Sequence, residues 1–245
     1  MYQKMTERLI RLLSRKPFLV GMVHLRGLPG SPSYDNQVMP VKKVYEIALT
    51  EATALKNAGM DGLLIENMHD VPYNCGSSVG PDVVAHMTAI STLIRKEFPD
   101  TPIGVQVLAA ANRQAIAVAA AADLDFVRVE GFVFSHIADE GFINSCAADL
   151  LRFRKSIEAE NVSIFADVKK KHSSHAITSD ISHSCVAEAA RFCKADACIV
   201  TGAKTGHAPP SDVINGKFSC LSLKGFFVEN YFFQRLHPLL IFFRL

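Results

Sequence analysis

The amino-acid sequence predicts an α/β fold of the (β/α)8 TIM-barrel type, in which parallel strands close into a barrel and helices surround it. Short apolar runs of strand length alternate with segments of helical periodicity, the order expected for right-handed βαβ units. Several of these runs turn polar at their C-terminal ends, which line the mouth of such barrels. An open doubly wound sheet is the alternative, but no G-x-G-x-x-G turn follows the first apolar run.

The elements follow one another at a regular spacing. An amphipathic pattern at residues 4–14 predicts a helix that caps the floor of the barrel. Strands are predicted at residues 18–23, 63–66, 103–108, 126–130, 162–168 and 197–200. Helices are predicted between them at residues 44–58, 81–94, 113–122, 146–158 and 182–193. About six β/α units are therefore recognisable, whereas the fold needs eight.

Glycine and proline mark the boundaries of these elements. Pro17 ends the first helix, and the glycines and prolines of residues 27–32 exclude a helix directly after the first strand. Gly59 is suited to the C-terminal end of the next helix, and Pro81 to the first turn of the one after it. The connection at residues 67–76 is long for a barrel of this kind, which favours a functional loop.

Residues 217–245 differ in character from the rest of the chain. They hold seven of the sixteen phenylalanines without helical period or alternation, and four of their five charges are basic. We predict an incomplete barrel domain at residues 1–216 and an atypical tail at residues 217–245 that is not native to the fold. The first and sixth strands are then expected to have unpaired edges. The longest uncharged run of the tail, residues 236–243, is too short to span a membrane.

Composition and charge exclude some classes of function. Lys and Arg (26) nearly balance Asp and Glu (24), so no basic field indicates nucleic acid as a partner. The six cysteines form no C-x-x-C pair, which suits reduced thiols in a cytoplasmic protein. No secretory signal is visible, but the basic residues near the N-terminus leave a mitochondrial presequence open as an alternative to the floor helix.

Polar residues at the ends of four predicted strands are candidates for a functional site: His24, Glu66, Asp167 and Thr201. Because side chains alternate between the two faces of a strand, all four can converge on the C-terminal mouth of the barrel. His24 could be a general base, a metal ligand or a histidine that only hydrogen-bonds at a strand end. Glu66 and Asp167 alone make a thin shell for Mg²⁺, so we predict no metal ligands and name no cofactor.

Lysines accompany Asp167. Lys169 lies on the same strand face and Lys171 follows it. A lysine beside a carboxylate can be an acid–base pair, an anion clamp or a Schiff-base nucleophile, and the alternative is a solvated cluster. The predicted catalytic residues are Asp167, Lys171, His24 and Glu66. Arg128 and Glu130 share a strand face and are expected to neutralise each other inside the barrel.

Several short motifs of the sequence carry a family resemblance when taken together. They are residues 21–25 with 28–32, residues 62–67, Val79-Gly80-Pro81, Asp167 with Lys171-His172, and residues 200–206. In this order, over about residues 5–213, the chain resembles the BtpA family, which has a ribulose-phosphate-binding barrel and is named for a photosystem I biogenesis factor. The matched motifs add the substrate-binding candidates Asn67, His172, Thr201 and Gly202.

The resemblance implies a barrel protein of unknown reaction. One implication is a lyase, isomerase or hydrolase that acts on a small phosphorylated metabolite, and the alternative is a non-catalytic biogenesis factor that acts through protein contacts. Gln106 and Glu130 stand where asparagines are expected from the family, and Lys169 where a histidine is expected. The last two β/α units supply the anion site in phosphate-binding barrels, so their apparent loss implies impaired function.

Overall fold

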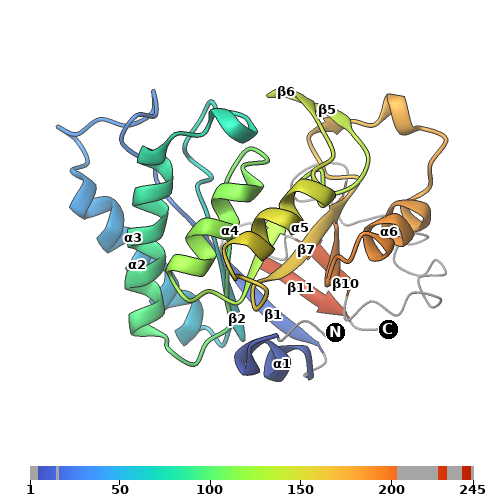
Figure 1. Ribbon diagram of the computed structural model, residues 1–245. Coiled ribbons are helices and arrows are strands. Elements are labelled where there is room, and N and C mark those ends of the chain that lie inside the picture. The colour runs from blue at the N-terminus through green and yellow to red at the C-terminus, as the bar shows by residue number, and fades with distance from the viewer. Residues whose placement is uncertain (1–4, 15–16, 203–225, 231–238, 244–245) are drawn as a thin grey trace.

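The computed structural model describes residues 5–14, 17–202, 226–230 and 239–243, and these form a closed barrel with helices around it (Figure 1). Around the barrel the strand order is β1-β11-β10-β9-β7-β4-β3-β2. The strands are β1 Phe18–His24, β2 Gly62–Glu66, β3 Ile103–Gln106, β4 Phe126–Val129, β7 Ser163–Val168, β9 Ala197–Val200, β10 Phe226–Asn230 and β11 Leu239–Phe243. The predicted barrel is thus confirmed, and six of its strands lie where the sequence places them.

Helices form the outer layer. They are α2 Val41–Asn57, α3 Pro81–Glu97, α4 Asn112–Ala121, α5 Ala147–Ser156 and α6 His183–Phe192. Pro81 occupies the first turn of α3, as predicted, and the apolar faces of α2 to α6 cover the outward side chains of the strands. Among the described residues, no helix is long and apolar enough to cross a membrane.

The expectation of unpaired edges on the first and sixth strands is wrong. β10 runs parallel to β9, and β11 runs antiparallel to both β10 and β1, so the two tail strands close the barrel. An antiparallel neighbour needs only a short connection, whereas a parallel one needs a crossover of a dozen or more residues. The barrel therefore closes with seven strands parallel and one reversed. Residues 217–225 and 231–238 of the predicted tail lie outside the described part of the chain.

A repeated aspartate joins neighbouring strands at the floor of the barrel. Each aspartate directly precedes a strand and makes two hydrogen bonds to one residue of the strand before it. The pairs are Asp61 with Leu19, Asp125 with Ile103, and Asp196 with Ile164. In each pair the aspartate N–H donates to the partner carbonyl at 2.8–2.9 Å, and the carboxylate accepts from the partner N–H at 2.8–3.0 Å. This clamp satisfies backbone groups at the strand start that have no ladder partner there.

Apolar side chains fill the barrel interior near the N-terminal ends of the strands. Helix α1, Glu7–Ser14, buries its leucines against the interior residues of β1 at the floor, so the floor-helix interpretation of this pattern is confirmed. The rings of Phe126 and Phe165 stack across the interior with centroids 4.6 Å apart. A side chain at position 104 would approach the Phe126 ring to 2.2 Å, which requires glycine there. In the described part of the barrel, the C-terminal end is where a site can lie.

A small antiparallel sheet stands at that end, opposite α1 in Figure 1. It consists of β5 His136–Ala138, β6 Gly141–Ile143 and β8 Ser173–Ser174, in the order β6-β5-β8. β5 and β6 belong to the connection after β4, and β8 to the connection after β7. The sheet therefore joins two loops at one side of the mouth.

Candidate functional site

Polar side chains occupy the last interior-facing position of successive barrel strands. Val20 and Met22 of β1 face the interior, and alternation then brings His24 to the same face at the mouth. The residues that end β2, β3, β4 and β7 on this face, or directly follow β9, are Glu66, Gln106, Arg128, Asp167 and Thr201. The predicted convergence of His24, Glu66, Asp167 and Thr201 on one mouth therefore agrees with the geometry of the strands. Gln106 and Arg128 extend the set.

His24 and Glu66 form the most direct contact of the mouth. They pair in register across β1 and β2, and Nε2 of His24 lies 3.2 Å from Oε2 of Glu66. Both side chains are largely buried, with exposed fractions of 12% for His24 and 9% for Glu66. The ring of His69 lies edge-on to that of His24, with centroids 6.4 Å apart. Burial, and then the positive charges of Arg26 and His24, lower the pKa of His69.

Arg128 and Asp167 form a second buried pair. Nε of Arg128 donates to both carboxylate oxygens of Asp167, at 3.0 and 3.2 Å. The expected neutralisation of Arg128 by Glu130 is wrong, because Glu130 instead bonds Lys170 at 3.0 Å and the N–H of Ala110 at 2.7 Å. Burial disfavours the charge of Lys170, but the adjacent Glu130 carboxylate outweighs burial and raises the pKa of the ammonium group. Each buried charge thus has an opposite partner from another segment.

Asn67, predicted to bind substrate, joins two loops of the mouth. Its Oδ1 accepts the N–H of Leu108 at 2.7 Å, and its Nδ2 donates to the Leu108 carbonyl and to Asp70, each at 3.3 Å. Asp70 in turn accepts the N–H of Leu28 at 3.1 Å. The amide therefore positions the loops after β1, β2 and β3, and a direct contact with substrate stays a prediction.

A backbone-to-side-chain hydrogen bond joins the loop after β7 to the residue that follows β9. The N–H of Lys171 donates to Oγ1 of Thr201 at 3.0 Å, next to the buried Gly202. Lys169 has a φ of 47°, which turns the chain off the strand, and its ammonium group donates to the Thr178 carbonyl at 3.0 Å. The ammonium group of Lys169 therefore bonds the loop after β8, although Lys169 and Asp167 line the same small cavity.

His172 lies apart from the buried pairs of the mouth. Its side chain is exposed, and its φ of 53° is in the left-handed region. The roles predicted for His172, Lys171, Thr201 and Gly202 stay predictions.

Two residues that the sequence reasoning left out have buried polar atoms without a hydrogen-bond partner in the described part of the chain. These atoms are Oε1 of Gln106 and Nε2 of His136. His136 stands at the start of β5, with its ring centroid 5.2 Å from that of His175. Both histidines line a cavity of about 20 Å³ beside Asp167 and Lys170, which is room for about one water molecule. Gln106 could have been found from its place at a strand end, but His136 carries no comparable signal.

Within the described residues, no group of three or more His, Cys, Asp or Glu side chains has a geometry that could hold a metal ion. The mouth presents its carboxylates in pairs with basic side chains instead. Glu66 and Asp167 contact His24 and Arg128, respectively. The chemistry that this arrangement supports directly is proton transfer and hydrogen bonding.

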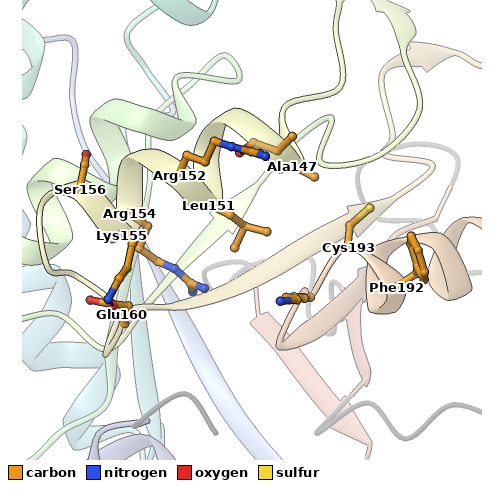
Figure 2. A pocket seen from close by; sticks show the side chains of 11 residues that line it. Ala147, Leu151, Arg152, Arg154, Lys155, Ser156, Glu160, Phe192 and Cys193 are labelled. Carbon is orange, nitrogen blue, oxygen red and sulfur yellow. Dashed lines mark hydrogen bonds and ion pairs between the residues drawn. The ribbon is translucent and has the colours of Figure 1, made fainter. Parts of the chain in front are cut away.

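One hollow of the described surface lies outside the barrel. It is a groove of about 710 Å³ between α5 and α6. Figure 2 shows Leu151 and Arg152 of α5 on one side and Phe192 and Cys193 on the other. The side chain of Phe192 is exposed. The groove contains none of the mouth residues.

Comparison with known sequences places the chain among relatives from three domains of life. The sequence profile described as the BtpA family matches residues 15–224. A Caenorhabditis elegans protein named "Uncharacterized protein F13E9.13, mitochondrial" is 46% identical over 201 residues, which cover 80% of this chain and 71% of that protein. An uncharacterised protein of Archaeoglobus fulgidus is 33% identical over 77% of this chain and 72% of its own length.

Two further likenesses cover less of the other protein. The Synechocystis protein named "Photosystem I biogenesis protein BtpA" is 33% identical over 78% of this chain and 64% of its own length. Among solved structures, 2,3-dimethylmalate lyase, a member of the PEP mutase/isocitrate lyase superfamily, superposes with a TM-score of 0.53 at 14% identity. That match covers 89% of this chain and 66% of the lyase, less than two thirds of its length. At this identity the likeness supports the barrel fold alone.

Proposed function

The chain belongs to the BtpA family, and from this membership and the geometry of the mouth we propose that it is an enzyme that transfers protons on a small phosphorylated metabolite. The reaction class is that of a lyase, an isomerase or a hydrolase. The observation that carries the proposal is the contact of 3.2 Å between His24 and Glu66 at the mouth, on the same interior face as the Arg128–Asp167 pair. Barrel enzymes bind substrate at this end of the strands.

His24 is the proton-transfer group in this proposal. Imidazole changes its charge near neutral pH, and general acid–base catalysis by a positioned side chain contributes about 10²–10⁴-fold in rate. Oε2 of Glu66 lies 3.2 Å from Nε2 of His24 and holds the orientation of the ring for the transfer. The 12% exposure of the His24 side chain supports access for a ligand that enters the mouth.

Asp167 has a different role from that of His24. The single N–H at Nε of Arg128 is shared between the two carboxylate oxygens of Asp167, at 3.0 and 3.2 Å, so Asp167 is held in place as a group that orients substrate. The phosphate group of the substrate lies across the mouth at Lys171, with the backbone N–H of Gly202 beside it. A lysine and a glycine backbone are common partners of phosphate oxygens.

A ligand panel tests this proposal on the chain itself. Phosphorylated sugars and related metabolites are screened by thermal shift, in which a ligand at about 100 times its Kd stabilises the protein by about 2.7 kcal/mol. That corresponds to a rise in Tm of roughly 5–10 °C for a chain of this size. We expect a shift for wild type that is lost in Asp167→Asn and Lys171→Ala. It should be kept in His86→Gln, because His86 bonds Tyr45 in the helix layer.

The result that would contradict the proposal is also clear. If no phosphorylated compound shifts the wild-type Tm, or if shifts persist unchanged in both mouth variants, the mouth is not a site for such metabolites.

A role in assembly is the second candidate, favoured by the groove between α5 and α6 with the exposed Phe192 (Figure 2). The Synechocystis relative carries the name of a biogenesis protein. In this alternative a partner protein binds the barrel exterior. A pull-down should then recover the same partner from wild type and Lys171→Ala but not from Phe192→Asp. Loss of that partner in Lys171→Ala alone would favour the mouth instead.

The cellular location of the protein, mitochondrial or cytoplasmic, is part of the same proposal. The name of the worm relative includes "mitochondrial", and the basic residues of the N-terminal region are compatible with import into that organelle. Imaging of the chain with a C-terminal fluorescent tag would separate a mitochondrial from a cytoplasmic location.

A further inference from the structure

We infer that Gln106 is a binding residue that selects substrates carrying a hydroxyl group. The inference rests on the proposed function and deepens it, because it specifies which polar group the phosphorylated metabolite presents to the mouth. Gln106 Oε1 would accept a hydrogen bond from that hydroxyl group.

The position of Gln106 directs its amide into the barrel. In β3, Ile103 and Val105 pack in the outer core, while the bare Cα of Gly104 faces the interior ring of Phe126. Alternation places Gln106 on the same interior face as Gly104, one step nearer the mouth. It pairs in register with Glu66, which itself pairs with His24. Three neighbouring strands therefore present imidazole, carboxylate and amide side by side.

The amide oxygen of Gln106 is buried without a partner. The residue is 2% exposed, and Oε1 has no hydrogen-bond partner within the described part of the chain. Nearly all buried polar atoms in folded proteins are bonded, so such an atom calls for an explanation. Because Gln106 lies at the mouth of a barrel, the explanation we adopt is that Oε1 is an acceptor for a group of the ligand.

The surroundings indicate a neutral donor. Carboxylates of the mouth are already compensated, Asp167 by Arg128 and Glu130 by Lys170, and Glu66 contacts His24. A cationic ligand would therefore gain little, whereas a hydroxyl group needs only one well-placed acceptor. In the strand order, β3 and β9 are separated by β4 and β7 on one side and by four strands on the other. A ligand that spans the mouth can thus reach Gln106 with its hydroxyl end and Thr201 with its phosphate end.

A first experiment concerns the ligand-free protein. Gln106→Met keeps the length of the side chain and removes its polar atoms, so Tm should rise by about 2–4 °C because an unbonded buried acceptor disappears. The matched control is Gln114→Met, since Nε2 of Gln114 donates to the Gly76 carbonyl at 3.2 Å. That variant should not gain stability. A fall in the Tm of Gln106→Met would mean that the protein itself bonds Oε1, and would overturn the inference.

A second experiment concerns selectivity. Ribose 5-phosphate and glucose 6-phosphate are each compared with their 2-deoxy analogue, together with the hydroxylated hits of the ligand panel and their deoxy forms. In wild type the hydroxylated member should bind at least tenfold more tightly, because the analogue leaves the acceptor unbonded. In Gln106→Met this preference should fall to within twofold, while binding of the deoxy member is kept.

The two proposals fail in different ways. If phosphorylated compounds bind wild type and Gln106→Met with the same preference for the hydroxylated member, the inference is wrong and the proposed function stands. If no phosphorylated compound binds wild type, the proposed function is wrong and the assignment of a substrate hydroxyl to Gln106 falls with it.

Discussion

Nε2 of His24 and Oε2 of Glu66 lie 3.2 Å apart at positions that pair in register across β1 and β2. This relationship follows directly from the parallel sheet, because interior positions of neighbouring strands face one another at the same height. No loop of the mouth is therefore needed to position the side chain of His24 or of Glu66. Rigid strands position the pair, which is the condition for reproducible proton transfer.

The Arg128–Asp167 pair predicts a strong effect on stability. Arg128→Met leaves the Asp167 carboxylate buried without its cation, and such a loss costs about 3–5 kcal/mol of unfolding free energy. The double variant Arg128→Met/Asp167→Leu removes both charges and should recover most of that loss. Urea denaturation of the three proteins checks this. A loss below about 1 kcal/mol in the single variant would show that other groups compensate Asp167.

Asp125 and Asp123 provide a matched pair at the floor. Asp125 is fully buried and accepts from Arg8, Arg95 and the N–H of Ile103, at 2.9, 2.6 and 2.8 Å. Asp123 bonds Arg8 at 3.0 Å, but its side chain is 64% exposed. We expect Asp125→Ala to cost about 3–5 kcal/mol and Asp123→Asn, which tolerates the φ of 52° at that position, less than about 1 kcal/mol, as measured by chemical denaturation. Equal losses of unfolding free energy in the two variants would contradict the claim that Asp125 stabilises the floor of the barrel.

His136 predicts a dependence of stability on pH. Burial, with the positive charges of His175 and Lys170, lowers the pKa of His136 to about 4. The unfolded chain binds a proton near pH 6.5, so the contribution of neutral His136 is complete above that pH and is lost as the pH falls towards 4. The difference amounts to about 3 kcal/mol.

The control for this pH effect is His136→Gln, which cannot titrate in that range. Unfolding free energies measured from pH 7 to pH 4.5 should fall more steeply for wild type than for the variant. Parallel curves for the two proteins would mean that the pKa of His136 is the same in the folded and unfolded states.

The reversed strand predicts the effect of truncation. A chain that ends at residue 225 lacks β10 and β11, and would leave β9 and β1 with unpaired edges. We expect the whole chain to melt in a single cooperative transition and the shortened chain to aggregate without one. Scanning calorimetry and light scattering check both. A truncated chain that melts as sharply as the whole one would support the prediction that residues 217–245 are not native to the fold.

The barrel could be predicted from the sequence because its strands are buried on both faces and separated by amphipathic helices. β10 and β11 escaped prediction because they carry no periodicity of their own, and only pairing with β9 and β1 defines them as strands. Pairing of this kind joins residues far apart in the sequence, and local sequence patterns do not predict it.

For the site, too, the sequence predicts positions on strands but not contacts between residues far apart in the chain. His24 and Glu66 could be placed together from strand ends alone, since alternation and parallel pairing are general rules. The partners of Arg128 and Glu130 were mistaken because shared strand face was taken for contact. Cross-strand neighbours on β7 and its exit loop lie closer, at 3.0 Å in each case. The place of Gln106 at a strand end could have marked it as a candidate, whereas His136 became visible only through an atom that lacks a partner among the described residues.

The most direct test of the account is the turnover of a phosphorylated metabolite that binds wild type, followed by NMR in parallel for wild type, His24→Gln and His86→Gln. We predict that His24→Gln lowers kcat by about 10²–10⁴-fold with binding retained, and that His86→Gln leaves kcat within twofold of wild type. Turnover by His24→Gln at the wild-type rate would contradict the assignment of proton transfer to the His24–Glu66 pair.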